Sequence, residues 1–195
     1  SYYWDDPLNQ AVMKAWQAGI VVVTSAGNTG PAPMTISVPG NVPYVITVGS
    51  VTDHYTPEDL SDDRITSFSA SGPTHAGFIK PDLLAWGGHM MGKIHDTYLP
   101  TLVEQHPESL LGQSYYEISG TSQASAVVAG TVALMLQNDP SLNPDDVKCR
   151  LMASAQMAVA ADGKAAYSPF KQGAGKVNAW GAVQSTATGC ANNGL

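Results

Sequence analysis

A serine that follows a glycine and opens an apolar segment is the most chemically suggestive feature of the sequence. Residues 119–125 read SGTSQAS, and the small apolar residues that follow predict a helix. The free N–H groups and positive dipole end of a helix N-terminus favour the oxyanion that forms when a serine attacks a carbonyl. Ser122 is therefore a candidate nucleophile. Hydroxyl residues also cap helices, so this pattern alone leaves a purely structural role for Thr121 or Ser122 open.

An asparagine stands in the second suggestive segment, TSAGNTG at residues 24–30, directly after a β-branched run. The carboxamide of Asn28 has the chemistry needed to donate a hydrogen bond to a developing oxyanion. Asparagine between glycines is also ordinary turn chemistry, so a simple turn is the alternative interpretation of this segment.

The elements that must position these two segments predict an α/β layered fold. Unbroken β-branched runs at residues 20–24 and 44–51 are typical of parallel strands covered on both faces. In such sheets chemistry lies at the carboxyl ends of the strands, where both segments fall. Apolar periodicity and capping residues predict four helices, between Asp6 and Gly19, at 124–137, at 143–155 and at 177–186. The helix at 124–137 is predicted to be buried on nearly every face. Residues 52–92 are predicted to be mostly loop with a strand-like piece at 65–69, and residues 89–113 an excursion over the surface.

Taken together, the segments resemble the subtilase family of serine proteases. SGTSQASAVVAG is similar to the nucleophile motif of that family, and VVVTSAGNTG is similar to its oxyanion-asparagine motif. Further matches follow in the same order: VPGNVPYVITVGSV, ITSFSASGP, KPDLLAWG and GAGKVNAWGAV. The resemblance identifies residues 1–195 as the C-terminal portion of a single catalytic domain, with 89–113 as a surface insertion.

The resemblance implies a three-layer α/β fold whose mostly parallel sheet carries helices on both faces and is incomplete on its N-terminal side. It also implies that Ser122 is the nucleophile and that Asn28, with the backbone N–H of Ser122, forms the oxyanion hole. A cis peptide bond is implied before Pro39. The implied substrate-binding residues are Thr24, Ser25, Ala26, Gly27, Gly120 and Thr121.

Two partners of the nucleophile are missing. Subtilases carry their histidine in a His-Gly-Thr turn and their aspartate before Ser-Gly or Thr-Gly, yet none of the five histidines precedes a glycine, and Asp96-Thr97 lacks the glycine. We therefore expect a segment absent from this chain to supply the triad Asp and His, and the chain alone to be inactive. Residues Ala126 and Trp86 also stand where the family usually has proline.

Two alternatives to an active protease stay open: a catalytically inactive subtilase-like fragment and a non-enzymatic α/β binding module. An α/β-hydrolase is excluded by chain order, because that fold places its histidine after the serine, whereas the last histidine, His106, precedes Ser122.

Charge and composition limit the partners. A net charge of -7 with only 9 Lys and Arg argues against nucleic-acid binding, and no apolar run is long enough to cross a membrane. We expect a polypeptide substrate, together with either the N-terminal half of the same domain or a second copy, because uncovered sheet edges and helix faces recruit partners. No cofactor is expected. Calcium is common in the family that the sequence resembles, but no run of acidic residues here specifies a calcium site. His89, His95 and His106 are too irregularly spaced to predict a zinc site.

The two cysteines, Cys149 and Cys190, lack the spacing of a metal site. Cys149 falls in a predicted helix and Cys190 in a Gly- and Asn-rich tail. A disulfide would hold the tail against the body and would indicate a secreted or otherwise extracytoplasmic protein, whereas two free thiols are the alternative.

Overall fold

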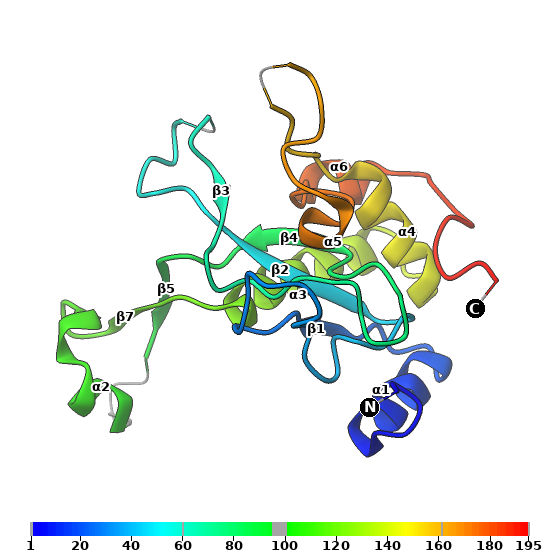
Figure 1. The fold of residues 1–195 in the computed structure, drawn as a ribbon, viewed down its shortest axis with the longest axis horizontal. Coiled ribbons are helices and arrows are strands. Elements are labelled where there is room, and N and C mark those ends of the chain that lie inside the picture. The colour runs from blue at the N-terminus through cyan, green and yellow to red at the C-terminus, as the bar shows by residue number, and fades with distance from the viewer. Residues whose placement is uncertain (1, 60, 95–100, 161, 195) are drawn as a thin grey trace.

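A four-stranded, mostly parallel sheet forms the centre of the chain (Figure 1). The computed structural model describes residues 2–59, 61–94, 101–160 and 162–194. Strands β1 (Val23–Ser25), β2 (Ile46–Thr52) and β4 (Leu83–Trp86) are parallel, and β3 (Arg64–Ile65) runs antiparallel to β2. Val48 pairs with both Ser25 and Leu83, so β1 and β4 lie on opposite sides of β2. This arrangement confirms the predicted α/β fold class.

Four helices share one apolar core with β2 and β4. They are α1 (Pro7–Gln17), α3 (Thr121–Asn138), α4 (Pro144–Ser154) and α6 (Ala179–Gln184). Their buried side chains meet in a single cluster that includes Trp16, Ile46, Val48, Leu83, Val128, Met135, Val147, Leu151 and Ala182. The side chains of Asp6 and Asn143 cap α1 and α4, as the sequence predicts. Short α5 (Pro169–Gln172) was not predicted.

Two elements are less buried than the sequence indicates. Strand β1 begins at Val23 rather than at residue 20, and the side chain of Ile20 is 59% exposed. Among the described residues β1 pairs with β2 alone, so one of its sides is open. Helix α3 begins at Thr121 rather than at residue 124 and buries only one face, leaving Leu134 54% exposed. The prediction that this helix is buried on nearly every face is therefore wrong.

A small antiparallel sheet projects from the body at residues 90–118 (Figure 1). It consists of β5 (Met90–Lys93), β6 (Leu110–Leu111) and β7 (Tyr115–Ile118), with α2 (Thr101–Gln105) and the 3-10 turn η1 (Pro107–Ser109) between β5 and β6. The segment predicted to be an excursion thus contains regular structure. Strand β5 pairs with β7, and Met90 lies opposite Ile118, which is distant in the sequence. Within residues 52–92, the strand-like piece at 65–69 is a strand only at Ile65, and β4 lies where loop was predicted.

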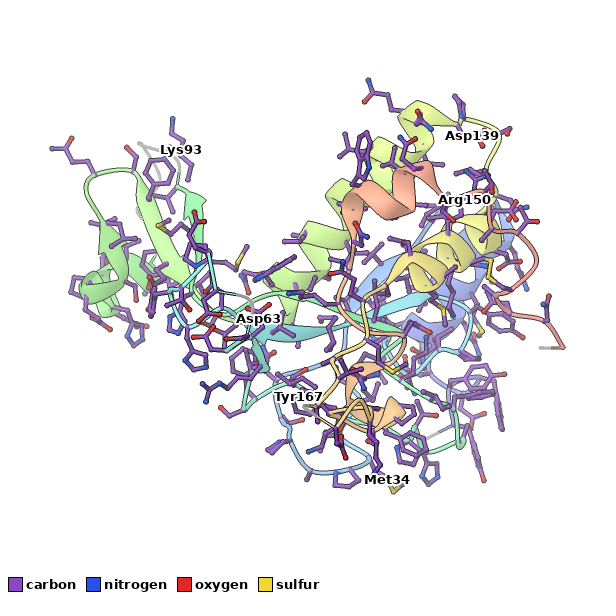
Figure 2. All side chains as sticks on the ribbon, turned by 90° about the horizontal axis from the view of Figure 1, so that it is seen from above. Met34, Asp63, Lys93, Asp139, Arg150 and Tyr167 are labelled. Atoms are coloured by element: carbon purple, nitrogen blue, oxygen red, sulfur yellow. A yellow bond between two sulfur atoms is a disulfide. The ribbon has the colours of Figure 1, made fainter. Side chains whose placement is uncertain are left out.

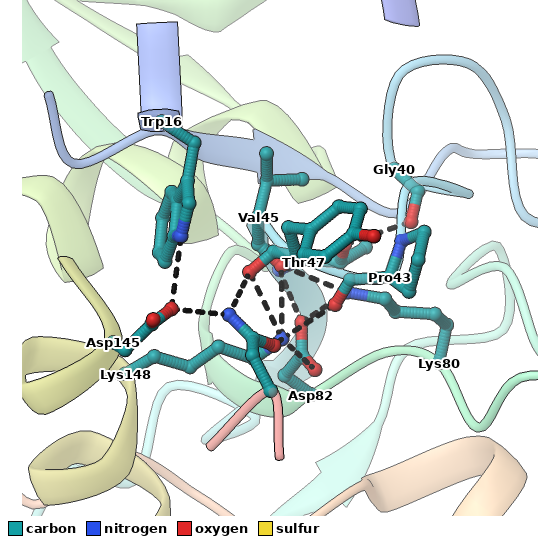
Figure 3. A network of polar contacts seen from close by, with 11 residues as sticks. Trp16, Gly40, Pro43, Val45, Thr47, Lys80, Asp82, Asp145 and Lys148 are labelled. Atoms are coloured by element: carbon teal, nitrogen blue, oxygen red, sulfur yellow. Dashed lines mark hydrogen bonds and ion pairs between the residues drawn. The ribbon is translucent and has the colours of Figure 1, made fainter. Parts of the chain in front are cut away.

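A buried ionic cluster supports the beginning of β2 (Figure 3). The Asp82 carboxylate accepts a hydrogen bond from Lys80 Nζ at 2.6 Å, and its other oxygen lies 3.2 Å from Lys148 Nζ. The backbone N–H of Thr47 also donates to Asp82, at 2.7 Å. All three charged side chains are nearly inaccessible to solvent. Burial lowers the pKa of Lys80 to about 7, with a further lowering from Lys148 that opposes the attraction of Asp82.

The C-terminal tail closes over this cluster. Cys149 of α4 and Cys190 form the predicted disulfide. Asn192, two residues further on, accepts a hydrogen bond from Lys148 Nζ at 3.1 Å and donates to the backbone carbonyl of Tyr44 at 3.1 Å. The bridge therefore holds a residue that provides buried hydrogen-bond partners for the cluster.

Replacing Asp82 by asparagine should strongly destabilise the fold, because Lys80 and Lys148, both buried, lose the carboxylate that is the one charged partner of each within the described ranges. We expect the free energy of unfolding to fall by about 3–5 kcal/mol in a denaturant titration. Asp162→Asn, which alters an exposed ion pair with Lys164, is the control and should leave the free energy of unfolding almost unchanged. Equal effects from both substitutions would contradict this role for Asp82.

Candidate functional site

One side-chain oxygen joins the end of β1 to the start of α3. The backbone N–H of Thr121 donates to Asn28 Oδ1 at 2.9 Å, and the Thr121 hydroxyl donates to the same oxygen at 2.8 Å. The Thr121 hydroxyl oxygen in turn accepts the N–H of Gly27 at 3.2 Å. Because Oδ1 is held twice, the amide nitrogen of Asn28 must point away from Thr121.

The amide nitrogen of Asn28 faces the turn that carries Ser122. A methyl group built on Gly120 would lie 3.4 Å from Asn28 Nδ2 and 3.7 Å from the backbone nitrogen of Ser122, but also 2.7 Å from Gln123 Oε1. A ligand atom at this position would therefore displace the flexible end of the Gln123 side chain. One position beside Gly120 is therefore close to both donors. In the part of the chain that the structure describes, Asn28 Nδ2 has no hydrogen-bond acceptor. Asn28 and Ser122 are both exposed, so both groups can meet a molecule from solvent.

Ser122 is the second residue of α3. The N–H groups in the first turn of a helix have no intrahelical acceptor, so the Ser122 N–H is available to an oxyanion. The Ser122 carbonyl accepts a hydrogen bond from the Ser125 hydroxyl at 2.7 Å. Within the described residues the Ser122 hydroxyl forms no hydrogen bond with a basic side chain. Helix α3 is continuous through Ala126, as expected for alanine at a position where a proline would remove a backbone N–H.

The predicted substrate-binding residues lie around this junction. Thr24 and Ser25 belong to β1, and Ala26 is fully buried, with its carbonyl accepting the backbone N–H of Ser37 at 2.9 Å. Gly27 has a φ of +112°, and a side chain there would meet Ser37 at 2.8 Å, so this position requires glycine. The Val38-Pro39 bond is cis, as the resemblance implies.

A polar cluster beside the turn that carries Ser122 was not predicted from the sequence. The Tyr55 hydroxyl donates to Glu117 at 3.0 Å, and His89 Nδ1 lies 3.1 Å from the same carboxylate oxygen. The backbone N–H of His89 donates to the Ser119 hydroxyl at 2.8 Å, which ties the cluster to the turn. Partial desolvation and the Glu117 carboxylate raise the pKa of Tyr55. These residues stand far apart in the sequence and form no local motif, so no sequence signal pointed to them.

The structure brings no metal site together from the described side chains: no three His, Cys, Asp or Glu residues converge as ligands would. His106 pairs with Glu108 at 3.0 Å and His89 with Glu117, while His95 lies outside the described residues. No helix in the described ranges is long and apolar enough to cross a membrane.

Comparison with known proteins identifies the family of the chain. Residues 3–175 match the family model described as the subtilase family, and the chain belongs to this family of serine proteases. It is 45% identical over 145 residues to serine protease AprX of Bacillus subtilis (strain 168), a match that covers 74% of this chain. It is 30% identical over 188 residues to subtilisin-like protease SBT6.1 of Arabidopsis thaliana, covering 90% of this chain.

Solved structures show the same fold. The structure of the prenylagaramide maturation protease PagA matches 90% of this chain and 54% of its own chain, with a TM-score of 0.64 and 23% identity. The patellamide maturation protease PatA matches 89% of this chain and 54% of its own chain, with a TM-score of 0.61 and 27% identity. The chain spans only 32% of the AprX sequence and 15% of the SBT6.1 sequence.

Replacing Thr121 by valine should loosen the junction while preserving its shape. The substitution removes one hydrogen bond to Asn28 and leaves the N–H of Gly27 without its acceptor, so unfolding should become easier by about 1–2 kcal/mol. Ser125→Ala, which removes a hydroxyl from the exposed neighbouring turn, should have a much smaller effect. If thermal denaturation shows the two variants to be equally stable, the junction does not have the role described.

Proposed function

We propose that this chain carries the nucleophile and oxyanion hole of a serine endopeptidase that hydrolyses peptide bonds through an acyl-enzyme on Ser122. The observation that carries the proposal is the pair of hydrogen bonds from Thr121 to Asn28 Oδ1, because they leave the amide nitrogen directed toward the position that the Ser122 N–H also reaches. Membership of the subtilase family supports the same assignment.

In the proposed reaction, Ser122 Oγ attacks the carbonyl carbon of the scissile peptide bond, and its proton passes to a histidine. Asn28 Nδ2 and the Ser122 N–H donate hydrogen bonds to the resulting oxyanion. The C–N bond then breaks, with the histidine returning the proton to the leaving amine. Water then attacks the acyl-enzyme while the same histidine takes a proton from it. The histidine returns this proton to Ser122 Oγ as the carboxylic acid is released.

The triad histidine and aspartate come, in this proposal, from a segment outside residues 1–195. Two exposed apolar surfaces support an N-terminal half of the domain as the partner that supplies them. In the part of the chain that the structure describes, β1 pairs on one side only, and both Ile20 and Leu134 of α3 are exposed. An additional strand and helix would cover both surfaces, as they do in complete layered sheets.

The substrate in this proposal is a polypeptide that binds beside Thr24, Ser25, Ala26, Gly27, Gly120 and Thr121, where the Gly27 N–H donates to the Thr121 hydroxyl at 3.2 Å. The backbone segments there are small-residue turns, which allow an extended peptide to approach Asn28 closely. The disulfide between Cys149 and Cys190 supports an extracytoplasmic location, where such bonds persist.

Labelling with a fluorophosphonate tests the assignment of the nucleophile. The chain combined with its N-terminal half should be labelled at Ser122, and labelling should disappear in Ser122→Ala but persist in Ser125→Ala. Asn28→Ala should reduce kcat by about 10²–10³, the loss known for this type of donor in subtilisin itself. A complete assembly that is never labelled at Ser122 would instead support a non-enzymatic binding module or an inactive fragment.

A substitution on α3 tests the proposed partner surface. Leu134→Lys places a charge on the exposed face and should weaken association with the N-terminal half by at least tenfold, because an unpaired charge would be buried in the interface. Met91→Lys, on the projecting sheet at a side chain that is 67% exposed, is the matched control and should not change the affinity. Isothermal calorimetry measures both. Equal affinities would contradict the proposed surface, and light scattering would show whether a second copy binds there instead.

A further inference from the structure

A cavity lies beside strands β3 and β4, and Ser122 is not among the residues that line it. Its volume is about 600 Å³, within the range of small-molecule and side-chain binding sites. Residues before and within β3 form one wall, and the segment that leads to α5 forms the other. Figure 2 labels Asp63 and Tyr167, which line these two walls. None of the residues assigned to the catalytic site lines this cavity.

One wall contains a carboxylate with a free oxygen. The side chain of Asp63 is only 10% exposed, and its Oδ2 forms an ion pair with Lys176 Nζ. Its Oδ1 is buried and has no hydrogen-bond partner in the part of the chain that the structure describes. A buried acceptor without a donor is unfavourable, so this oxygen favours a ligand that donates an N–H group. Asp63 is one of the residues that line the cavity, so this acceptor belongs to the cavity wall.

The ionic cluster at Asp82 shows what kind of donor completes such a site in this protein. There, one carboxylate oxygen lies against Lys80 Nζ and the other against Lys148 Nζ. At Asp63, Oδ2 pairs with the ammonium group of Lys176, whereas Oδ1 has no corresponding ammonium group among the described residues. An ammonium group from outside the chain would fill the same place.

The rest of the cavity suits an apolar chain attached to that ammonium group. Val51, Leu84, Met157 and Val159 contribute aliphatic surface. Met157 is 53% exposed and Val159 61% exposed, so both side chains would gain burial from an occupant. The backbone bridge from Val159 to Ala165 holds this wall in an extended conformation. Arg64, the nearby cation on the rim, is exposed, so solvent weakens its repulsion of an amine.

We propose that this cavity binds a primary amine on an aliphatic chain, with the ammonium group at Asp63 Oδ1 and the chain against Met157 and Val159. A free alkylamine and a lysine side chain of a bound peptide share this chemistry. The excess of acidic over basic residues, 16 against 9, favours a cationic ligand over an anionic one. The site does not depend on catalysis at Ser122.

The methyl NMR signal of Met157 in the full chain provides a direct test. Hexylamine and a capped Leu-Lys-Leu peptide are titrated separately, and at least one should shift this signal saturably. Tighter binding of the peptide assigns the site to a lysine side chain, and tighter binding of hexylamine assigns it to free amines. Hexanol, which has the same chain without the charge, should bind at least tenfold more weakly.

Substitutions at the carboxylate locate the binding. Asp63→Asn should weaken binding of the amine about tenfold, the loss expected for one charge-assisted hydrogen bond, whereas Asp162→Asn outside the cavity should not. Circular dichroism checks that both variants fold. The proposal is overturned if neither probe shifts Met157, if hexanol binds as tightly as hexylamine, or if both variants bind the amine equally well. The comparison with hexanol decides the matter even if Asp63→Asn does not fold.

Discussion

The candidate site depends on the carbonyl oxygen of a single asparagine side chain. Asn28 Oδ1 accepts both the N–H and the hydroxyl hydrogen of Thr121, 93 residues away in the sequence. This double contact joins the carboxyl end of β1 to the beginning of α3 and sets the orientation of the asparagine amide. A shorter side chain would not reach Thr121, and a carboxylate would offer no N–H to an oxyanion. The identity of Asn28 therefore follows from the need for an acceptor at one end and a donor at the other.

The rest of the fold keeps the two segments in place. Strand β2 is buried along its whole length and pairs with β1, so the position of Asn28 relative to the sheet is fixed by backbone hydrogen bonds. At the other end of β2, Asp82 and two lysines bind backbone groups that precede and begin the strand. The disulfide holds the tail over these charges. Charged groups so deeply buried persist because each is paired and hydrogen-bonded, which makes the cluster sensitive to the loss of any member.

The fold class, most helices, the disulfide partners and the serine and asparagine segments could be predicted from the sequence, because each has a local pattern or a family motif. The extent to which β1 and the residues before it are buried could not be predicted from the sequence. The run at residues 20–24 has the composition of a central strand, yet Ile20 is exposed because no second neighbour lies against β1 among the described residues. Strand β4 and the sheet at residues 90–118 depend on pairings between distant residues, and Asp63 and Lys176 come together only in the folded chain.

A structure of the chain with its N-terminal half and a peptide boronic acid would test the central claim most directly. The boron atom should be bonded to Ser122 Oγ, with one boronate oxygen about 2.7–3.1 Å from both Asn28 Nδ2 and the Ser122 nitrogen. A boronate bound to a different residue, or an oxygen held by only one of these donors while Thr121 still binds Asn28, would contradict the account.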